Sequence, residues 1–227
     1  MTYSASGSNY VVDEYGEVVP RLFDAELSPM HRRVPQPQLV VYDSEQQISK
    51  LQLYHSRLNQ LEHDSGTLVI HIDGACRNNG TLAARASWGV YVGPGSRYNT
   101  KGLLSSELIS QSSSRAEIEA LAGSLDVARS ITADDFSLND VKIASDSQYL
   151  VKALSMWISG WIEAGGVRSN GQPVAHFDRL REIHEMLDEM EFGDYGGVSV
   201  QLWHVDREMN READALANQA LDQALGA

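Results

Sequence analysis

A buried strand that ends on a carboxylate constrains this chain more than any other stretch. Residues 68–73 have the sequence Leu-Val-Ile-His-Ile-Asp, and Gly74 follows. An unbroken run of mostly apolar and β-branched residues predicts a buried strand, and the glycine predicts a turn. A carboxylate at the end of such a strand is poorly solvated and needs a partner, often a cation. On these residues alone, a turn-capping role for Asp73 is an equally good interpretation.

Three further carboxylates occupy comparable places. Residues 141–146 predict a second strand that ends on Asp146, while Glu117 and Asp214 lie in the first turns of two expected helices. If the two strands are parallel neighbours, their carboxylates emerge at one edge of the sheet. Four carboxylates suit a pair of Mg²⁺ ions, which can activate a water and stabilise the leaving oxygen of a phosphodiester. Near a helix start, Glu117 and Asp214 can also simply favour the helix dipole.

From Thr67 onward, turn residues separate regular strands and helices. Strands are predicted at residues 68–73, 86–92, 98–104, 141–146 and 198–204, and helices at 112–129, from Ser147 through Trp161, at 177–190 and from about Asn210. The three serines at 112–114 and Asn210 are N-cap residues by type. Three antiparallel strands followed by helix-separated ones predict an α/β fold with a mixed five-stranded sheet flanked by helices.

The first 64 residues differ from this pattern and predict a separate N-terminal extension before a catalytic domain at 65–227. Prolines and glycines punctuate short apolar pieces, and then apolar residues recur every three or four positions between Ser44 and Asp64. That spacing predicts an amphipathic helix at 44–64. Such a helix either lies against the main domain or binds a protein partner.

Composition narrows the class of protein. No apolar run approaches the ~20 residues of a membrane span, and Cys76 is the single cysteine, which excludes a disulfide framework. The N-terminus lacks the pattern of a secretion signal or transit peptide. An intracellular protein of the nucleus or cytoplasm is therefore expected. The formal charge of -13 means that a nucleic-acid substrate needs local neutralisation by a divalent metal or a small basic patch.

The motifs together resemble the cellular type-1 ribonuclease H family, of the eukaryotic or fungal type, from about Leu68 to Leu221. In order they are Ile-Asp73-Gly-Ala, Ser-Arg-Ala-Glu117, Ser-Asp146-Ser, and His204 followed by Asn210-Arg-Glu-Ala-Asp214. The resemblance implies an endonuclease that cuts the RNA strand of RNA–DNA hybrids and leaves a 3′-hydroxyl and a 5′-phosphate. It also implies two Mg²⁺ ions, with Mn²⁺ as a substitute.

Carried over by motif, Asp73, Glu117, Asp146 and Asp214 are the metal ligands and catalytic carboxylates. His204 corresponds to a mobile histidine beside the metals, and an imidazole that titrates near neutral pH suits proton transfer there. A histidine that is merely hydrogen-bonded at the strand end is the structural alternative. For the whole chain, the alternative is a catalytically weak or inactive module that binds nucleic acid or a protein partner.

The expected substrate contacts depart from the family more than the carboxylates do. They are Asn78, Asn79, Ser112, Ser113, Ser114, Trp157, Trp161 and His176. Where relatives carry longer polar side chains before the catalytic glutamate, this chain has three serines. Where the eukaryotic enzymes have an arginine for a DNA-strand phosphate, it has Ser110, so that contact is expected to be weaker. The two tryptophans match channel-lining residues, although burial in the helix core is an equal possibility.

Overall fold

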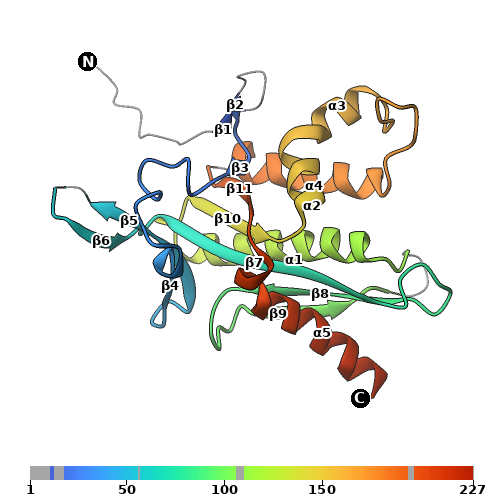
Figure 1. Ribbon diagram of the computed structural model, residues 1–227, viewed down its shortest axis with the longest axis horizontal. Helices are drawn as coiled ribbons and strands as arrows, with labels where there is room; N and C mark the ends of the chain where they lie inside the picture. The colour runs from blue at the N-terminus through green and yellow to red at the C-terminus, as the bar shows by residue number, and fades with distance from the viewer. Residues whose placement is uncertain (1–10, 13–17, 56, 106–109, 194–196, 227) are drawn as a thin grey trace.

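The computed structural model describes residues 11–12, 18–55, 57–105, 110–193 and 197–226, and they are organised around one mixed sheet (Figure 1). The sheet has nine strands: β3 (Leu22–Phe23), β4 (Val40–Asp43), β5 (Ile48–His55), β6 (Gln60–His63), β7 (Thr67–Arg77), β8 (Arg85–Tyr91), β9 (Thr100–Leu103), β10 (Asp140–Ser145) and β11 (Ser199–His204). A separate pair is formed by β1 (Val11–Val12) and β2 (Val18–Val19). The predicted α/β class is confirmed, whereas the prediction of five strands is too low.

Helices flank the sheet. They are α1 (Ser113–Asp134), α2 (Gln148–Lys152), a π-helical turn at Ala153–Trp157, α3 (Ile158–Glu163), α4 (Phe177–Phe192) and α5 (Arg211–Leu225), with short 3₁₀ turns at Gln36–Gln38 and Arg207–Met209. The expected N-cap is present at Ser112, whose hydroxyl accepts from the Arg115 N–H at 3.2 Å. In the described part of the chain, no helix is long and apolar enough to cross a membrane.

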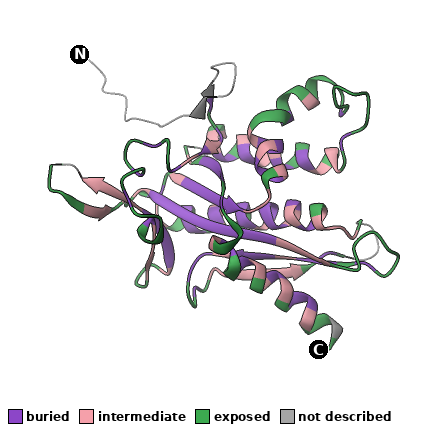
Figure 2. Cartoon of the chain, in the orientation of Figure 1, coloured by how far each residue is buried: buried purple, intermediate pink, exposed green. Residues whose placement is uncertain are grey.

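The long strand β7 organises the sheet and is buried along most of its length (Figure 2). It pairs in parallel with β10, which pairs in parallel with β11, and β8 and β9 follow antiparallel on the other side of β7. Alternate residues of β7 enter different cores. Leu68, Ile70 and Ile72 pack with α1 and α4, whereas Val69 faces a second core.

The second core is where the structure corrects the predicted helix at 44–64, because that segment is β-structure. β4, β5 and β6 form an antiparallel meander, and β5 adds to β7 through the register pair Ser49↔Val69. The turns between these strands place Gln47 and Asn59 at positive φ (61° and 52°), which a right-handed helix does not allow. A partner-binding role for this segment therefore has no helix to support it.

The rest of the N-terminal segment is also built into the sheet. β3 pairs in parallel with β11, and Phe23 meets Trp203 edge to face at 5.4 Å between ring centroids. Buried Arg21 reaches α4 and donates to Asp188 at 2.5 Å and to Glu191 at 2.9 Å. Apolar packing and a buried ion pair thus attach residues 21–55 to the sheet from both ends.

This arrangement predicts different roles for two leucines that the helix would have made equivalent, since they stand seven positions apart. Leu51 is 0% exposed in the second core, whereas Leu58 is 58% exposed in the hairpin turn. Leu51→Ala should lower the free energy of unfolding by about 2–5 kcal/mol, and Leu58→Ala should change it by no more than about 0.5 kcal/mol. Urea denaturation of both variants measures the difference, and equal losses would contradict the strand assignment.

Candidate active site

Parallel pairing brings the two strand-end aspartates to one edge of the sheet. Within β7 and β10, His71 pairs with Ala144, and within β10 and β11, Ser145 pairs with His204. Asp73 lies two residues after His71, and Asp146 lies two residues after Ala144, so both aspartates lie just beyond the last paired residues of two adjacent strands. Neighbouring strands lie about 4.8 Å apart. The register of these strands therefore agrees with the prediction that Asp73 and Asp146 lie at one edge of the sheet.

Two glycines let helices approach this edge from opposite faces. A Cβ on Gly74 would stand 2.3 Å from the Glu117 backbone nitrogen, so β7 and the first turns of α1 are in direct contact. A Cβ on Gly89, the register partner of Asp73, would stand 2.6 Å from the Ala213 carbonyl oxygen in α5. Only glycine fits such distances. Glu117 and Asp214 reach the aspartates because these two positions carry no side chain.

The four carboxylates interact electrostatically. Asp73 is 8% exposed, and burial raises its pKa to about 8, with the neighbouring charges of Asp146, Asp214 and Glu117 adding to the rise and the Gly74 N–H opposing it. Burial also raises the pKa of Glu117, with a contribution from Asp146. A hydrogen bond from the Ser147 hydroxyl opposes that rise. Negative charge is therefore concentrated here and poorly solvated.

The donor chemistry of this cluster fits hard divalent cations. Carboxylate oxygens are the ligands that Mg²⁺ and Mn²⁺ take in proteins, and a cation would offset the repulsion that raises the pKa of Asp73. Within the described ranges, no three His, Cys, Asp or Glu side chains form a ready-made metal-binding group. The fit therefore rests on the type of donor and on the shared negative charge.

Asn210 is a site residue whose role differs from the predicted helix cap. It makes no capping hydrogen bond to α5. Its side-chain amide is 1% exposed and donates to the Ile72 carbonyl at 2.9 Å and to Asp146 at 3.3 Å. This side chain thus joins the end of β7 to the carboxylate after β10. Nothing in the sequence indicates this contact beyond the place of Asn210 in the last motif.

His204 is the last residue of β11, and its side chain is exposed beside the edge that carries the aspartates. It has no hydrogen-bond partner among the residues that the structure describes. The structural alternative, a histidine merely hydrogen-bonded at the strand end, is therefore not what the geometry shows. An exposed imidazole next to a carboxylate cluster is free to turn toward a substrate.

Known proteins resemble this chain in sequence and in fold. A model of the ribonuclease H family matches residues 65–222. The chain belongs to the ribonuclease H family. The resemblance drawn from the motifs is thereby confirmed, and the matched residues cover the range that the motifs indicated.

Individual relatives agree with the family match. Ribonuclease H of Paracidovorax citrulli is 33% identical over 162 residues, covering 70% of this chain and 97% of that protein. Ribonuclease H1 of Rattus norvegicus is 28% identical over 164 residues, covering 70% of this chain and 52% of that protein. The chain thus spans about half the length of the rat relative. LC11-RNase H1, isolated from compost, shares the fold with a TM-score of 0.51 at 22% identity, covering 70% of this chain and 99% of that one.

The residues expected to contact substrate in this ribonuclease H-like chain are spread around the carboxylates. Asn78 and Asn79 are exposed in the turn after β7, where Asn78 has a φ of 55°. Ser113 begins α1, and Ser114 is exposed in its first turn. All four have short polar side chains, and Ser113 is the one of them that is half-buried.

Two of the expected substrate contacts, Ser112 and His176, lie together. The Ser112 hydroxyl lies 3.4 Å from Nε2 of His176, and burial, followed by the charge of Arg115, lowers the pKa of that histidine. Sequence reasoning missed the two cations beside them. Arg115 and Arg179 both pair with Glu119, at 2.7 Å and 2.8 Å, so their charge is already partly neutralised.

The two tryptophans form an aromatic cluster with Tyr149. Trp157 and Trp161 lie 5.6 Å apart between ring centroids, and Tyr149 lies 6.3 Å from Trp157. Trp157 is 38% exposed, whereas Trp161 packs against the main core. Trp157 therefore lies at the surface, where it could line a channel, whereas Trp161 lies partly in the core.

The carboxylate cluster predicts that Asp73 destabilises the metal-free protein at neutral pH. Its pKa is about 8 in the folded chain against 3.8 normally, so the folded state retains a proton that the unfolded state loses. The stability that this proton supports is present below pH 4 and is lost as the pH rises toward 8. In EDTA at pH 7–8, Asp73→Asn should raise the free energy of unfolding, on the order of 1–3 kcal/mol.

Denaturation curves between pH 4 and pH 8 measure this effect. The gain from Asp73→Asn should grow with pH across that interval. Asp126→Asn, on the exposed side of α1, is the matched control and should leave the curve unchanged. A variant that is less stable than the parent at pH 8 would show that Asp73 is not strained by its neighbours.

Proposed function

We propose that this chain hydrolyses the RNA strand of RNA–DNA hybrids and leaves a 5′-phosphate and a 3′-hydroxyl. The observation that carries the proposal is the convergence of four carboxylates, from β7, α1, the end of β10 and α5, at one edge of the sheet. Membership of the ribonuclease H family supports it. This chain spans 97% of the Paracidovorax citrulli relative, which is named ribonuclease H. It spans 52% of the rat relative, which is named ribonuclease H1.

Asp73, Glu117, Asp146 and Asp214 would hold two Mg²⁺ ions, with Mn²⁺ as a substitute. When bound, such ions supply a nucleophile at neutral pH and stabilise charge on the phosphodiester. The chain itself does the positioning. Asn210 orients the Asp146 carboxylate, and the Ser147 hydroxyl orients Glu117. His204 stands exposed next to them, where it can exchange a proton with the departing strand.

RNA differs from DNA by its 2′-hydroxyls, which a protein reads in the wide minor groove of a hybrid. Asn78, Asn79 and Ser114, which are exposed, and half-buried Ser113 suit this role. Ser112 and His176 suit a backbone phosphate, and Trp157 suits a sugar or base face. These assignments are part of the proposal.

Asp73→Asn is predicted to remove cleavage while the fold remains. The amide keeps the volume of the side chain but cannot supply an anionic oxygen to a metal, so roughly a thousandfold loss of rate is expected, equivalent to about 4 kcal/mol of lost charge stabilisation. The measurement is cleavage of an end-labelled hybrid with Mg²⁺ and with EDTA. Asp126→Asn is again the matched control and should cut like the parent.

The outcome separates the two functions. Metal-dependent cutting of the RNA strand by the parent supports the enzyme. A parent that binds the hybrid but cuts nothing in Mg²⁺ or Mn²⁺ would favour the alternative of an inactive binding module. Rapid cleavage by a folded Asp73→Asn variant would remove this residue from the site.

Hybrid binding is predicted to depend weakly on salt. The chain has a net charge of -13, and Arg115 and Arg179 beside the candidate phosphate pocket already pair with Glu119. Few free cations mean few released counterions, so the logarithmic slope of affinity against salt should be shallower than about −4. Titrations in Ca²⁺ at several KCl concentrations measure it. A slope of about −7 or steeper would reveal a basic surface that this description lacks.

A further inference from the structure

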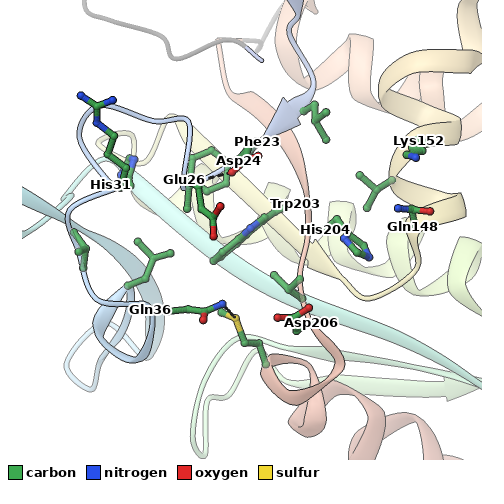
Figure 3. A pocket seen from close by; sticks show the side chains of 18 of the residues that line it. Phe23, Asp24, Glu26, His31, Gln36, Gln148, Lys152, Trp203, His204 and Asp206 are labelled. Atoms are coloured by element: carbon green, nitrogen blue, oxygen red, sulfur yellow. Dashed lines mark hydrogen bonds between the residues drawn. The ribbon is translucent and has the colours of Figure 1, made fainter. Parts of the chain in front are cut away.

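A cavity of about 500 Å³ adjoins His204 (Figure 3). Its walls come from three parts of the chain: the N-terminal segment after β3, the end of β11 with the loop after it, and α2. Much of one wall therefore lies outside residues 65–222, which match the family model. Of the residues given a role in the proposed function, His204 alone lines this cavity.

The floor of the cavity is apolar and aromatic. Phe23, Leu39 and Trp203 are buried in the second core and also line the cavity. Trp203 is 6% exposed, and its indole N–H makes no hydrogen bond to any residue that the structure describes. Figure 3 shows its ring projecting toward the same space as Glu26. A donor at the wall of an open cavity, without a partner in the described part of the chain, is suited to a ligand acceptor.

The rim is polar and carries both signs of charge. Lys152, Gln148 and His204 lie together on one side (Figure 3), and none has an ion pair or hydrogen-bond partner for its side chain within the described ranges. Glu26 and Asp206 are exposed elsewhere on the rim, also without side-chain partners there. Mixed charge does not suit a bare anion. It suits a ligand with a phosphate for the cations and hydroxyl or amino groups for the carboxylates.

We propose that this cavity binds one unpaired ribonucleotide of the RNA strand. The inference rests on the proposed function and adds a substrate feature to it. A base can stack on the apolar floor, and the carboxylates can accept hydrogen bonds from ribose hydroxyls. Lys152 can pair with the phosphate. A volume of about 500 Å³ is in the range of small-molecule sites. A stacked and paired base cannot enter a pocket walled by chain, so the nucleotide must be unpaired.

The order of the strand ends places this cavity beside the cut. β7, β10, β11 and β3 follow one another in parallel, so their carboxyl ends share one edge. His204 ends β11, two strand positions from Asp73, which is about 10 Å at the usual strand spacing. Asp24 follows β3, at the next position along the edge, and lines the cavity. A strand that leaves the carboxylates past His204 therefore meets the cavity next.

The first test measures binding without cleavage. Adenosine 5′-monophosphate and uridine 5′-monophosphate are titrated into the full chain in EDTA, and NMR follows the indole N–H signals of its four tryptophans. Trp203→Phe assigns the signal of Trp203. We expect a saturable shift of that signal with either nucleotide and none with inorganic phosphate. Because the test uses neither metal nor hybrid, it remains decisive even if hybrid cleavage is not found.

Two neighbouring arginines provide a matched pair of variants. Arg32 lines the cavity, whereas Arg33 lies over the Tyr54 ring, 5.8 Å from its centroid, and is not part of the lining. Lys152→Ala and Arg32→Ala should each weaken nucleotide binding by about fivefold, the loss expected for one hydrogen bond. Arg33→Ala should bind like the parent. Equal weakening by Arg33→Ala would show a general charge effect and would overturn the site.

The second test asks whether the nucleotide belongs to the strand being cut. kcat/KM is compared for a fully paired hybrid and for hybrids with one unpaired ribonucleotide at successive positions from the cut. We expect the parent to prefer a hybrid with the unpaired ribonucleotide at one particular position. The ratio of kcat/KM for that hybrid to kcat/KM for the fully paired hybrid should fall toward 1 in Lys152→Ala but not in Arg33→Ala. Free-nucleotide binding without any such preference would make the cavity a mononucleotide site and overturn its role on the strand. No response in either test would overturn the proposal altogether.

Discussion

The parallel pairing of β7 with β10 is the constraint on which the rest of the site depends. It places two aspartates just beyond the last paired residues of adjacent strands, whatever their mutual repulsion. The sheet can impose this because both strands are buried, with apolar side chains on each face, and a slip in register would expose them. The folding energy of the core therefore holds together charges that would otherwise separate.

Local contacts then limit the cost of that concentration of charge. The Gly74 N–H donates to Asp73, Asn210 donates to Asp146, and Ser147 donates to Glu117. The Gly74 and Ser147 contacts oppose the rise in pKa of Asp73 and of Glu117, yet burial still raises the pKa of both. The remaining instability is what a cation can offset, so the same strain that weakens the metal-free fold favours metal binding.

The sequence predicted those elements whose signal is local and strong. The long apolar run of β7, the serine cap of α1 and the motif order gave the fold class and the residues that the edge brings together. The helix predicted at 44–64 failed because the apolar spacing of Ile48, Leu51 and Leu61 also fits two strands with a turn between them. Only the pairing of this segment with β4 and β7 decides between these structures. The local spacing of apolar residues does not indicate which distant segments pair. The roles of Gly74, Gly89 and Asn210 were hidden for the same reason, since each depends on an element more than 40 positions away in the chain.

The N-terminal strand β3 has a consequence of its own, because it changes which groups share the edge that carries the carboxylates. Without β3, β11 would be the last strand, with His204 at the border of the sheet. With β3 paired beyond it, His204 becomes an interior position of the edge, between Asp146 on one side and Asp24 on the other. The Phe23–Trp203 contact fixes β3 at that place, and buried Arg21 anchors the residue before it to α4. Residues outside the part that matches the family model thus form one wall of the space next to the candidate catalytic histidine.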